Sequence, residues 1–147
     1  MDETFTILLA EDDPNDVMLV KLALESAGID RIQVVQDGAE AVEFLSGEKI
    51  CSNRRRFPLP ALVLLDIKMP KVTGLEVLAW LRENSNSRLK RLPVIIMSSS
   101  SEQKDIDRAY ELGVNAYLVK PHAFTELVEV LKTTTDFWRD TAAHPQV

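Results

Sequence analysis

Short apolar runs alternate with segments of helical periodicity along the chain. The apolar runs predict strands at 6–10, 31–35, 61–65, 94–97 and 116–119. The periodic segments predict helices from residue 14 to a stop at residue 28, and at 38–45, 73–84, 102–112 and 124–139. This strict alternation predicts an α/β fold, with a parallel sheet covered by helices on both faces.

The rules for connecting parallel strands reduce this alternation to a few topologies. Crossovers between parallel strands are right-handed, so we expect the flavodoxin-like doubly wound (βα)5 fold with five strands in the order 2-1-3-4-5. One domain is expected over residues 4–139, with a C-terminal tail at 140–147 and no second domain. The loop at 47–60 is long for such a fold. It contains Arg54, Arg55 and Arg56, which we interpret as part of a solvated loop.

Composition and charge narrow the class of protein. A net charge of -6 disfavours non-specific binding to nucleic acid or to an anionic membrane. The single cysteine, Cys51, cannot form an internal disulfide, and the acidic N-terminus lacks the pattern of a signal peptide. The apolar runs are too short to span a bilayer. We therefore expect a cytoplasmic protein without nucleic-acid or membrane partners.

Polar side chains stand at the carboxyl ends of four predicted strands. Glu11 and Asp12 follow the first strand, Asp66 the third, Ser98 the fourth and Lys120 the fifth. Open parallel sheets bind ligands at this edge, so we expect these side chains to converge. Carboxylates this close repel one another unless a cation neutralises them. Oxygen donors without His or Cys favour Mg²⁺ first and Mn²⁺ second.

The same set of residues is suited to a phosphoryl group. An Asp carboxylate can act as nucleophile toward a phosphoryl donor, which assigns that role to Asp66. The metal and Lys120 would each hold phosphoryl oxygens, while Ser98 would donate a hydrogen bond. Taken alone, each residue has a simpler structural interpretation. We assign Asp13 and Asp16 to the start of the first helix as helix-dipole partners, with Asp13 also as its N-cap and Pro14 in the first helical position. The convergence at several strand ends favours the functional interpretation.

The motifs around these residues resemble the receiver domain of bacterial response regulators over about residues 5–135. The aspartate motif, in which Gly74 follows Asp66 by eight residues, is the most specific of them. The matching segments are LAEDD at 9–13, LLDIKMP at 64–70, MSS at 97–99 and YLVKP at 117–121.

The resemblance implies a role for each matching acidic residue. Asp66 would be the phosphoacceptor. Asp12 and Asp66 would bind Mg²⁺ directly, Glu11 would act through water, and the backbone carbonyl of Lys68 would supply a further ligand. The protein would then be a signalling phosphoacceptor and not an enzyme, modified by a sensor histidine kinase.

The resemblance also implies how the modification is transmitted. Lys120 would hold the phosphoryl group, and its bond to Pro121 would match a cis peptide bond of the family. Ser98, where the family has Thr or Ser, and Tyr117 would form a switch. Their movement would alter protein–protein contacts on the face formed by residues 102–112, 116–119 and the last helix.

Two large aromatic side chains in the last predicted helix indicate a protein partner. Phe137 and Trp138 extend beyond the turn at which such a domain usually finishes, and they need cover from the domain or from a partner. We therefore expect a homodimer. The long loop and these two aromatics resemble the single-domain response regulators paired with bacterial phytochromes, which makes a bacteriophytochrome kinase the expected donor.

Three other functions remain open. A flavodoxin-like FMN carrier would need a Ser-, Thr- and Gly-rich phosphate loop after the first strand, and Glu11, Asp12 and Asp13 would instead repel the phosphate. The chain could be a receiver-like protein-binding module that is not regulated by phosphorylation. It could also be an Asp-nucleophile phosphatase of the haloacid-dehalogenase type, but such an enzyme needs a second acid two residues after the nucleophile. Lys68 occupies that position, which disfavours turnover.

Overall fold

The computed structural model describes residues 5–47 and 53–145, so that Cys51 and part of the loop at 47–60 lie outside the described residues. No helix in the described part is long and apolar enough to cross a membrane. The elements in chain order are β1 (Ile7–Ala10), α1 (Pro14–Ser26), β2 (Ile32–Val35), α2 (Gly38–Ser46), β3 (Leu62–Leu65), α3 (Gly74–Arg82), α4 (Ser87–Lys90), β4 (Val94–Ser98), α5 (Gln103–Glu111), β5 (Ala116–Val119), α6 (Phe124–Asp136) and the π-helical segment η2 (Phe137–Thr141).

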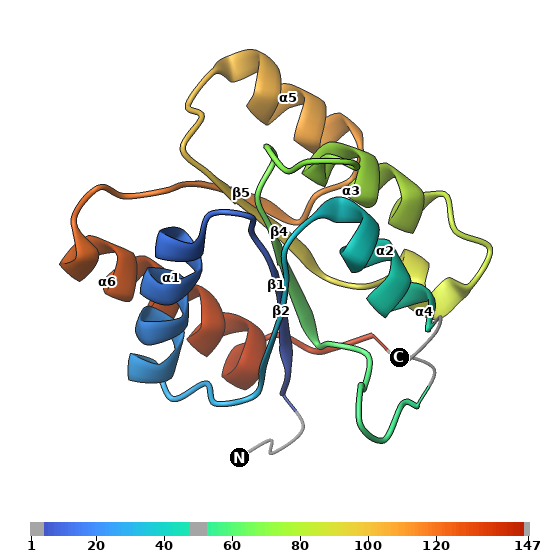
Figure 1. The fold of residues 1–147 in the computed structure, drawn as a ribbon. Helices are drawn as coiled ribbons and strands as arrows, with labels where there is room; N and C mark the ends of the chain where they lie inside the picture. The colour runs from blue at the N-terminus through green and yellow to red at the C-terminus, as the bar shows by residue number, and fades with distance from the viewer. Residues whose placement is uncertain (1–4, 48–52, 146–147) are drawn as a thin grey trace.

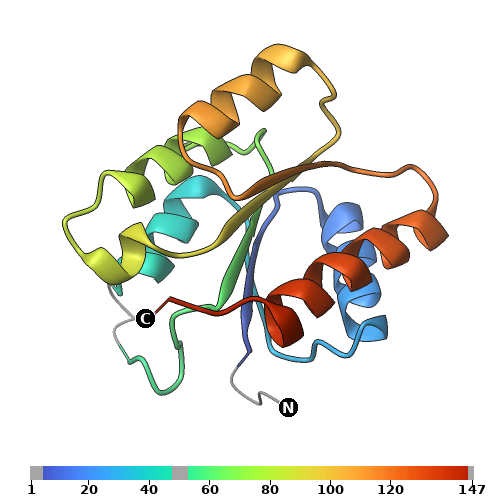
Figure 2. The ribbon, with the colours of Figure 1, turned by 180° about the vertical axis from the view of Figure 1, so that it is seen from behind.

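The strands form one parallel sheet in the order β2-β1-β3-β4-β5, which confirms the expected topology. α1 and α6 cover one face, and α2, α3 and α5 cover the other (Figures 1 and 2). Side chains alternate between two cores, so that Leu8 and Ala10 of β1 face one helical layer while Ile7 and Leu9 face the other. β1, β3 and β4 are buried along their whole length, and their carboxyl ends are therefore held in fixed positions.

Local sequence signals account for where several helices begin and end. Asp13 caps α1 by accepting a hydrogen bond from the Asn15 amide, and Pro14 occupies the first turn. Gly28, just beyond the end of α1, has a φ of 89°, a backbone conformation that glycine adopts without strain. α3 begins with a capping box between Thr73 and Glu76. The predicted elements are confirmed within a few residues of their ends.

The helix at the C-terminus differs from the prediction of one continuous element to residue 139. α6 ends at Asp136, and the backbone continues as the π-helical η2. Trp138 packs against the core between the sheet and the α1–α6 layer, whereas Phe137 is 50% exposed. The domain itself therefore covers one of the two aromatics and leaves the other at the surface. The boundary between a domain at 4–139 and a tail at 140–147 stays a prediction.

Two further features were not predicted. The short helix α4 lies between α3 and β4, where no helix was predicted, and the Asn86 side chain caps it. The interpretation of all three arginines of the long loop as solvated is wrong for Arg54. Its guanidinium donates to the carbonyls of Phe44 at 2.9 Å and Leu45 at 2.7 Å. The last carbonyls of a helix lack partners within it, so Arg54 supplies donors to the end of α2.

Candidate functional site

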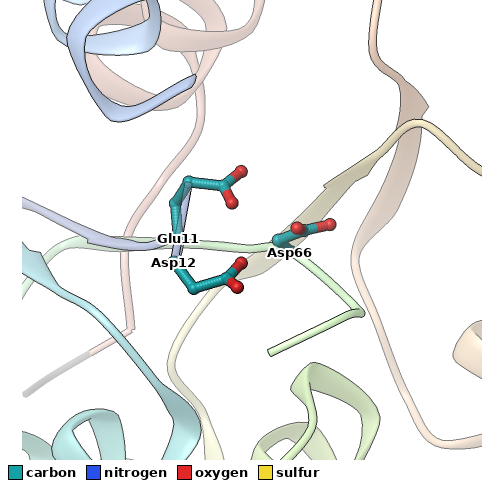
Figure 3. Close-up of side chains that lie close together, drawn as sticks. All are labelled: Glu11, Asp12 and Asp66. Atoms are coloured by element: carbon teal, nitrogen blue, oxygen red, sulfur yellow. The ribbon is translucent and has the colours of Figure 1, made fainter. Parts of the chain in front are cut away.

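Three carboxylates meet at the carboxyl edge of the sheet. Glu11, Asp12 and Asp66 each offer an oxygen, and these oxygens all lie within 4.8 Å of one another. β1 and β3 are neighbours in register, with Ala10 beside Leu65, so the residues that follow these two strands stand side by side. Figure 3 shows the side chains of Glu11 and Asp12 extending toward the side on which Asp66 lies. The convergence expected from the sequence is confirmed for all three.

Close backbone packing holds Asp66 in place. The Gly74 amide donates to the Ile67 carbonyl at 2.9 Å, which closes the loop after β3 back onto its own start. A Cβ atom at position 74 would lie 2.0 Å from the Asp66 carbonyl oxygen, so any other residue would push this loop away. The Asp66 carboxylate itself accepts a hydrogen bond from the Ile67 amide at 2.9 Å. The glycine of the aspartate motif is thus required by the space beside Asp66.

Lys120 reaches this edge from the end of β5 and binds two acids. Its ammonium lies 2.9 Å from a Glu11 carboxylate oxygen and 3.1 Å from one of Asp16. The Lys120 side chain is 13% exposed, Glu11 is 4% exposed and Asp16 is 35% exposed. The assignment of Asp16 to the helix dipole alone is therefore incomplete. Asp16 and Lys120 are 104 positions apart, and no local pattern could have predicted this ion pair.

Burial and charge shift the pKa values of the site. Burial raises the pKa of Glu11 to about 7, with a smaller upward contribution from the Asp66 charge, against the opposing effect of the Lys120 hydrogen bond. Burial also raises the pKa of Asp66, although the Lys120 charge opposes it. Burial would lower the pKa of Lys120, but the hydrogen bonds and charges of Glu11 and Asp16 outweigh it, so the net shift is upward. Glu11 and Asp66 are thus costly to ionise without a further positive charge.

Ser98 and Tyr117 are joined through the backbone of Ser100. Ser98 is 1% exposed, and its hydroxyl accepts from the Ser100 amide at 3.2 Å. The Tyr117 hydroxyl donates to the Ser100 carbonyl at 2.8 Å. The sequence anticipated both residues, but it did not anticipate that Ser100 connects them. The N-cap position of α5 is Glu102, whose side chain makes no capping bond.

The expected cis bond between Lys120 and Pro121 is wrong, because this peptide bond is trans. A bond before proline favours trans by only about 0.5–1 kcal/mol, so tertiary contacts select the isomer. Lys120 contacts Glu11 and Asp16 with the bond in this form. Lys68, whose backbone carbonyl was an expected ligand, lies on the loop after β3 and is exposed.

The donor set at this edge fits a hard divalent cation. All three groups are carboxylates, and the described residues near them include no histidine or cysteine ligand. Oxygen-only sets suit Mg²⁺ or Mn²⁺ in preference to softer metals. One ammonium cannot neutralise three acids, and a divalent ion would supply the missing positive charge.

The comparisons with known proteins agree with this geometry. Residues 7–132 match the family described as the response regulator receiver domain. Response regulator Rcp1 of Synechocystis sp. is 36% identical over 140 residues, which cover 95% of this chain and 92% of that protein. The fold is similar to the structure of its Mn²⁺-bound form, with a TM-score of 0.85, 36% identity, and coverage of 97% of this chain and 99% of the other.

Two further structures cover 97% of this chain and 99% of their own, each at 35% identity. One is a response regulator in red light signaling of R. palustris, with a TM-score of 0.90. The other is the phosphorylated cyanobacterial phytochrome response regulator RcpA, with a TM-score of 0.88.

Proposed function

Because this chain belongs to the response regulator receiver family, we propose that it is the phosphoacceptor of a two-component phosphorelay, modified on Asp66 by a sensor histidine kinase. The observation that carries this proposal is the cluster of Glu11, Asp12 and Asp66 beside Lys120. The cluster has the charge and the oxygen donors that phosphoryl transfer requires, at the sheet edge where such folds bind ligands.

The chain's residues have distinct roles in the transfer. Glu11, Asp12, Asp66 and the Lys68 carbonyl would hold Mg²⁺, or Mn²⁺ in its place, and the ion would neutralise charge on the phosphoryl oxygens. A carboxylate oxygen of Asp66 forms a bond to phosphorus as the bond between phosphorus and the donor nitrogen breaks. The site contributes positioning and charge neutralisation, with Lys120 beside the phosphoacceptor. Lys68 in place of a second acid supports a signalling role without turnover.

The link through Ser100 supports a switch at Ser98 and Tyr117. When the Ser98 hydroxyl turns toward the phosphoryl group, it gives up its bond to the Ser100 amide. The Ser100 backbone then loses its contact with Ser98, and Ser100 is held mainly through its hydroxyl, which donates to the Asp105 carboxylate at 2.6 Å. The carbonyl that accepts from Tyr117 can therefore shift. This mechanism alters the surface of α5, β5 and α6 as a shift between two populated states.

We propose a bacteriophytochrome kinase as donor, because relatives named for phytochrome and red light signaling match nearly the whole chain. We also propose a homodimer that covers the exposed Phe137, and a cytoplasmic location. Concentration-series light scattering, with and without beryllofluoride, tests the dimer. A monomer at all concentrations in both conditions would contradict it.

The phosphoacceptor is tested with acetyl phosphate and Mg²⁺. Wild-type protein should gain the mass of one phosphoryl group, and Asp66→Asn should gain none, because an amide is not a nucleophile toward phosphorus. Asp107→Asn is a matched control, since Asp107 lies on α5 at the surface, away from the acidic cluster. Intact-protein mass spectrometry reads the result. Modification of Asp66→Asn at the wild-type level would exclude Asp66, and no modification of either protein would favour a phosphorylation-independent binding module.

A further inference from the structure

Lys120 stands between two cavities of the protein. Glu11, Asp66 and Lys120 line a small cavity at the phosphoacceptor. Lys120 also lines a second cavity of about 270 Å³, where Asp16 is among the other lining residues. Within residues 5–47 and 53–145, the ion pairs of Lys120 are those with Glu11 and Asp16. Its ammonium is therefore divided between the acidic cluster and the first turn of α1.

We propose that Asp16 is a positioning residue that holds Lys120 in the unphosphorylated protein and releases it when Asp66 carries a phosphoryl group. This inference rests on the proposed function of Asp66. It assigns a regulatory role to a residue outside the set of acids that would hold the cation. The contact would set how readily the phosphoryl group is accepted and retained.

Exposure distinguishes the acid that Lys120 would release. Glu11 is nearly fully buried, and an unpaired carboxylate there would be costly. The Asp16 side chain is 35% exposed, so water can solvate its charge once Lys120 leaves. A phosphoryl group on Asp66 would also add negative charge on the cluster side of Lys120. The ammonium should therefore keep its place beside the cluster and give up Asp16.

The first turn of α1 does not require Asp16 for capping. Asp13 already caps this helix through its bond from the Asn15 amide. Asp16 instead makes a charge-assisted contact with a residue that follows the most distant strand in sequence. Its release would leave a carboxylate at the cavity between α1 and α6, so that modification would also change the charge of this face.

The first test compares Asp16→Asn with Asp13→Asn. Both variants remove one negative charge from the same end of α1, but only Asp16 contacts Lys120. Asparagine also keeps a side-chain oxygen with which position 13 can cap the helix. Beryllofluoride with Mg²⁺, titrated by calorimetry, reports the affinity for a phosphoryl mimic. Asp16→Asn should bind it about two- to fivefold more tightly than wild type, as expected for the loss of one partly exposed competing ion pair. Asp13→Asn should change the affinity by less than about twofold, because a solvated charge is screened.

The second test follows the Lys120 ammonium by NMR of ¹⁵N-labelled lysine side chains. Without beryllofluoride, the Lys120 signal should differ between wild type and Asp16→Asn. With beryllofluoride bound, the two signals should coincide, because Lys120 would no longer contact residue 16. A merely structural role of Asp16 would not remove the difference in this way.

The outcomes separate the two proposals. Failure of the wild-type protein to bind beryllofluoride, or to be modified on Asp66, would overturn the proposed function and with it the release of Asp16. Binding by wild type, with equal affinities in Asp16→Asn and Asp13→Asn, would overturn only the role of Asp16. Weaker binding by Asp16→Asn would mean that Asp16 still positions Lys120 in the modified state, which also contradicts release.

Discussion

The two ends of the sheet use their cations in different ways. At the carboxyl end, Lys120 contacts carboxylates, with Glu11 and Asp16 both within hydrogen-bonding distance. Near the amino ends of β4 and β5, Arg82 contacts mainly backbone, donating to the carbonyls of Gly113 at 2.8 Å, Lys90 at 3.0 Å and Leu92 at 2.8 Å. It also donates to the Asn115 side chain at 2.9 Å.

Because of this difference, the contacts of Lys120 can change with what the protein binds, whereas those of Arg82 stay constant. A carbonyl does not titrate and has no competing ion, so the contacts of Arg82 join α3 to the approaches of two strands under all ordinary conditions. A carboxylate can be protonated or taken by a metal, so the contacts of Lys120 depend on what else is bound. The amino end should therefore determine stability, and the carboxyl end should determine response.

The largest expected effect is on the Arg82 junction. Arg82→Met keeps much of the side-chain length and removes every donor. We expect the free energy of unfolding to fall by about 2–3 kcal/mol, because three carbonyls and one amide oxygen lose a charged partner. Urea unfolding of wild type and Arg82→Met measures this decrease in the free energy of unfolding. Divalent-ion affinity of the folded variant should match wild type, and loss of ion binding would contradict the division between the two ends.

The next effect is a pH dependence of stability in metal-free protein. The pKa of Glu11 is raised from 4.5 to about 7, so between these values the folded state binds more protons than the unfolded chain. Its free energy of unfolding should therefore decrease as pH rises through this window, by roughly 1–3 kcal/mol. Urea unfolding in EDTA at about pH 5 and about pH 8 measures the decrease. In Glu11→Gln most of this pH-dependent decrease should disappear. If the free energy of unfolding of that variant still fell as steeply with pH, the effect would belong to other groups.

Metal binding should show the opposite dependence on pH. A divalent ion favours the ionised Glu11, and a group with a pKa of about 7 changes from mostly protonated to mostly ionised across neutrality. We expect Mg²⁺ affinity to increase about tenfold from about pH 6 to about pH 8, with release of a proton on binding. Calorimetry in buffers of different ionisation enthalpy detects the proton. Equal affinity at both pH values would show that Glu11 is ionised without the metal.

The smallest effect compares two neighbouring arginines of the long loop. Arg54→Met should lower the free energy of unfolding by about 1–2 kcal/mol, because Arg54 donates to the last carbonyls of α2. Arg55→Met should change it by less than about 0.5 kcal/mol, since Arg55 is exposed. Thermal unfolding of the two variants gives the difference. Equal losses would show that the charge of the loop matters more than the capping contact.

Local sequence patterns predicted most helices and strands, because these elements depend on residues that are close together in the sequence. The apolar runs of β1, β3 and β4 predict buried strands, and Asp13 with Pro14 predicts the start of α1. The helix α4 was missed because four residues are too few to show a periodicity. The change from α6 to η2 was also missed, since Phe137 and Trp138 have no local signal that sets the pitch of a helix.

The sequence alone determined which chemistry meets at the carboxyl edge. A parallel sheet brings its strand ends together, so Glu11, Asp12 and Asp66 could be placed side by side from their positions alone. Only the tertiary structure decided which of these charges are paired. The Asp16–Lys120 contact depends on how α1 packs beside α6, next to the loop that follows β5, and side-chain pairing between distant elements leaves no periodic trace in sequence. Short sequence patterns are thus enough to place the acidic cluster. The pairing of Lys120 with Asp16 is decided only by the packing of the folded chain.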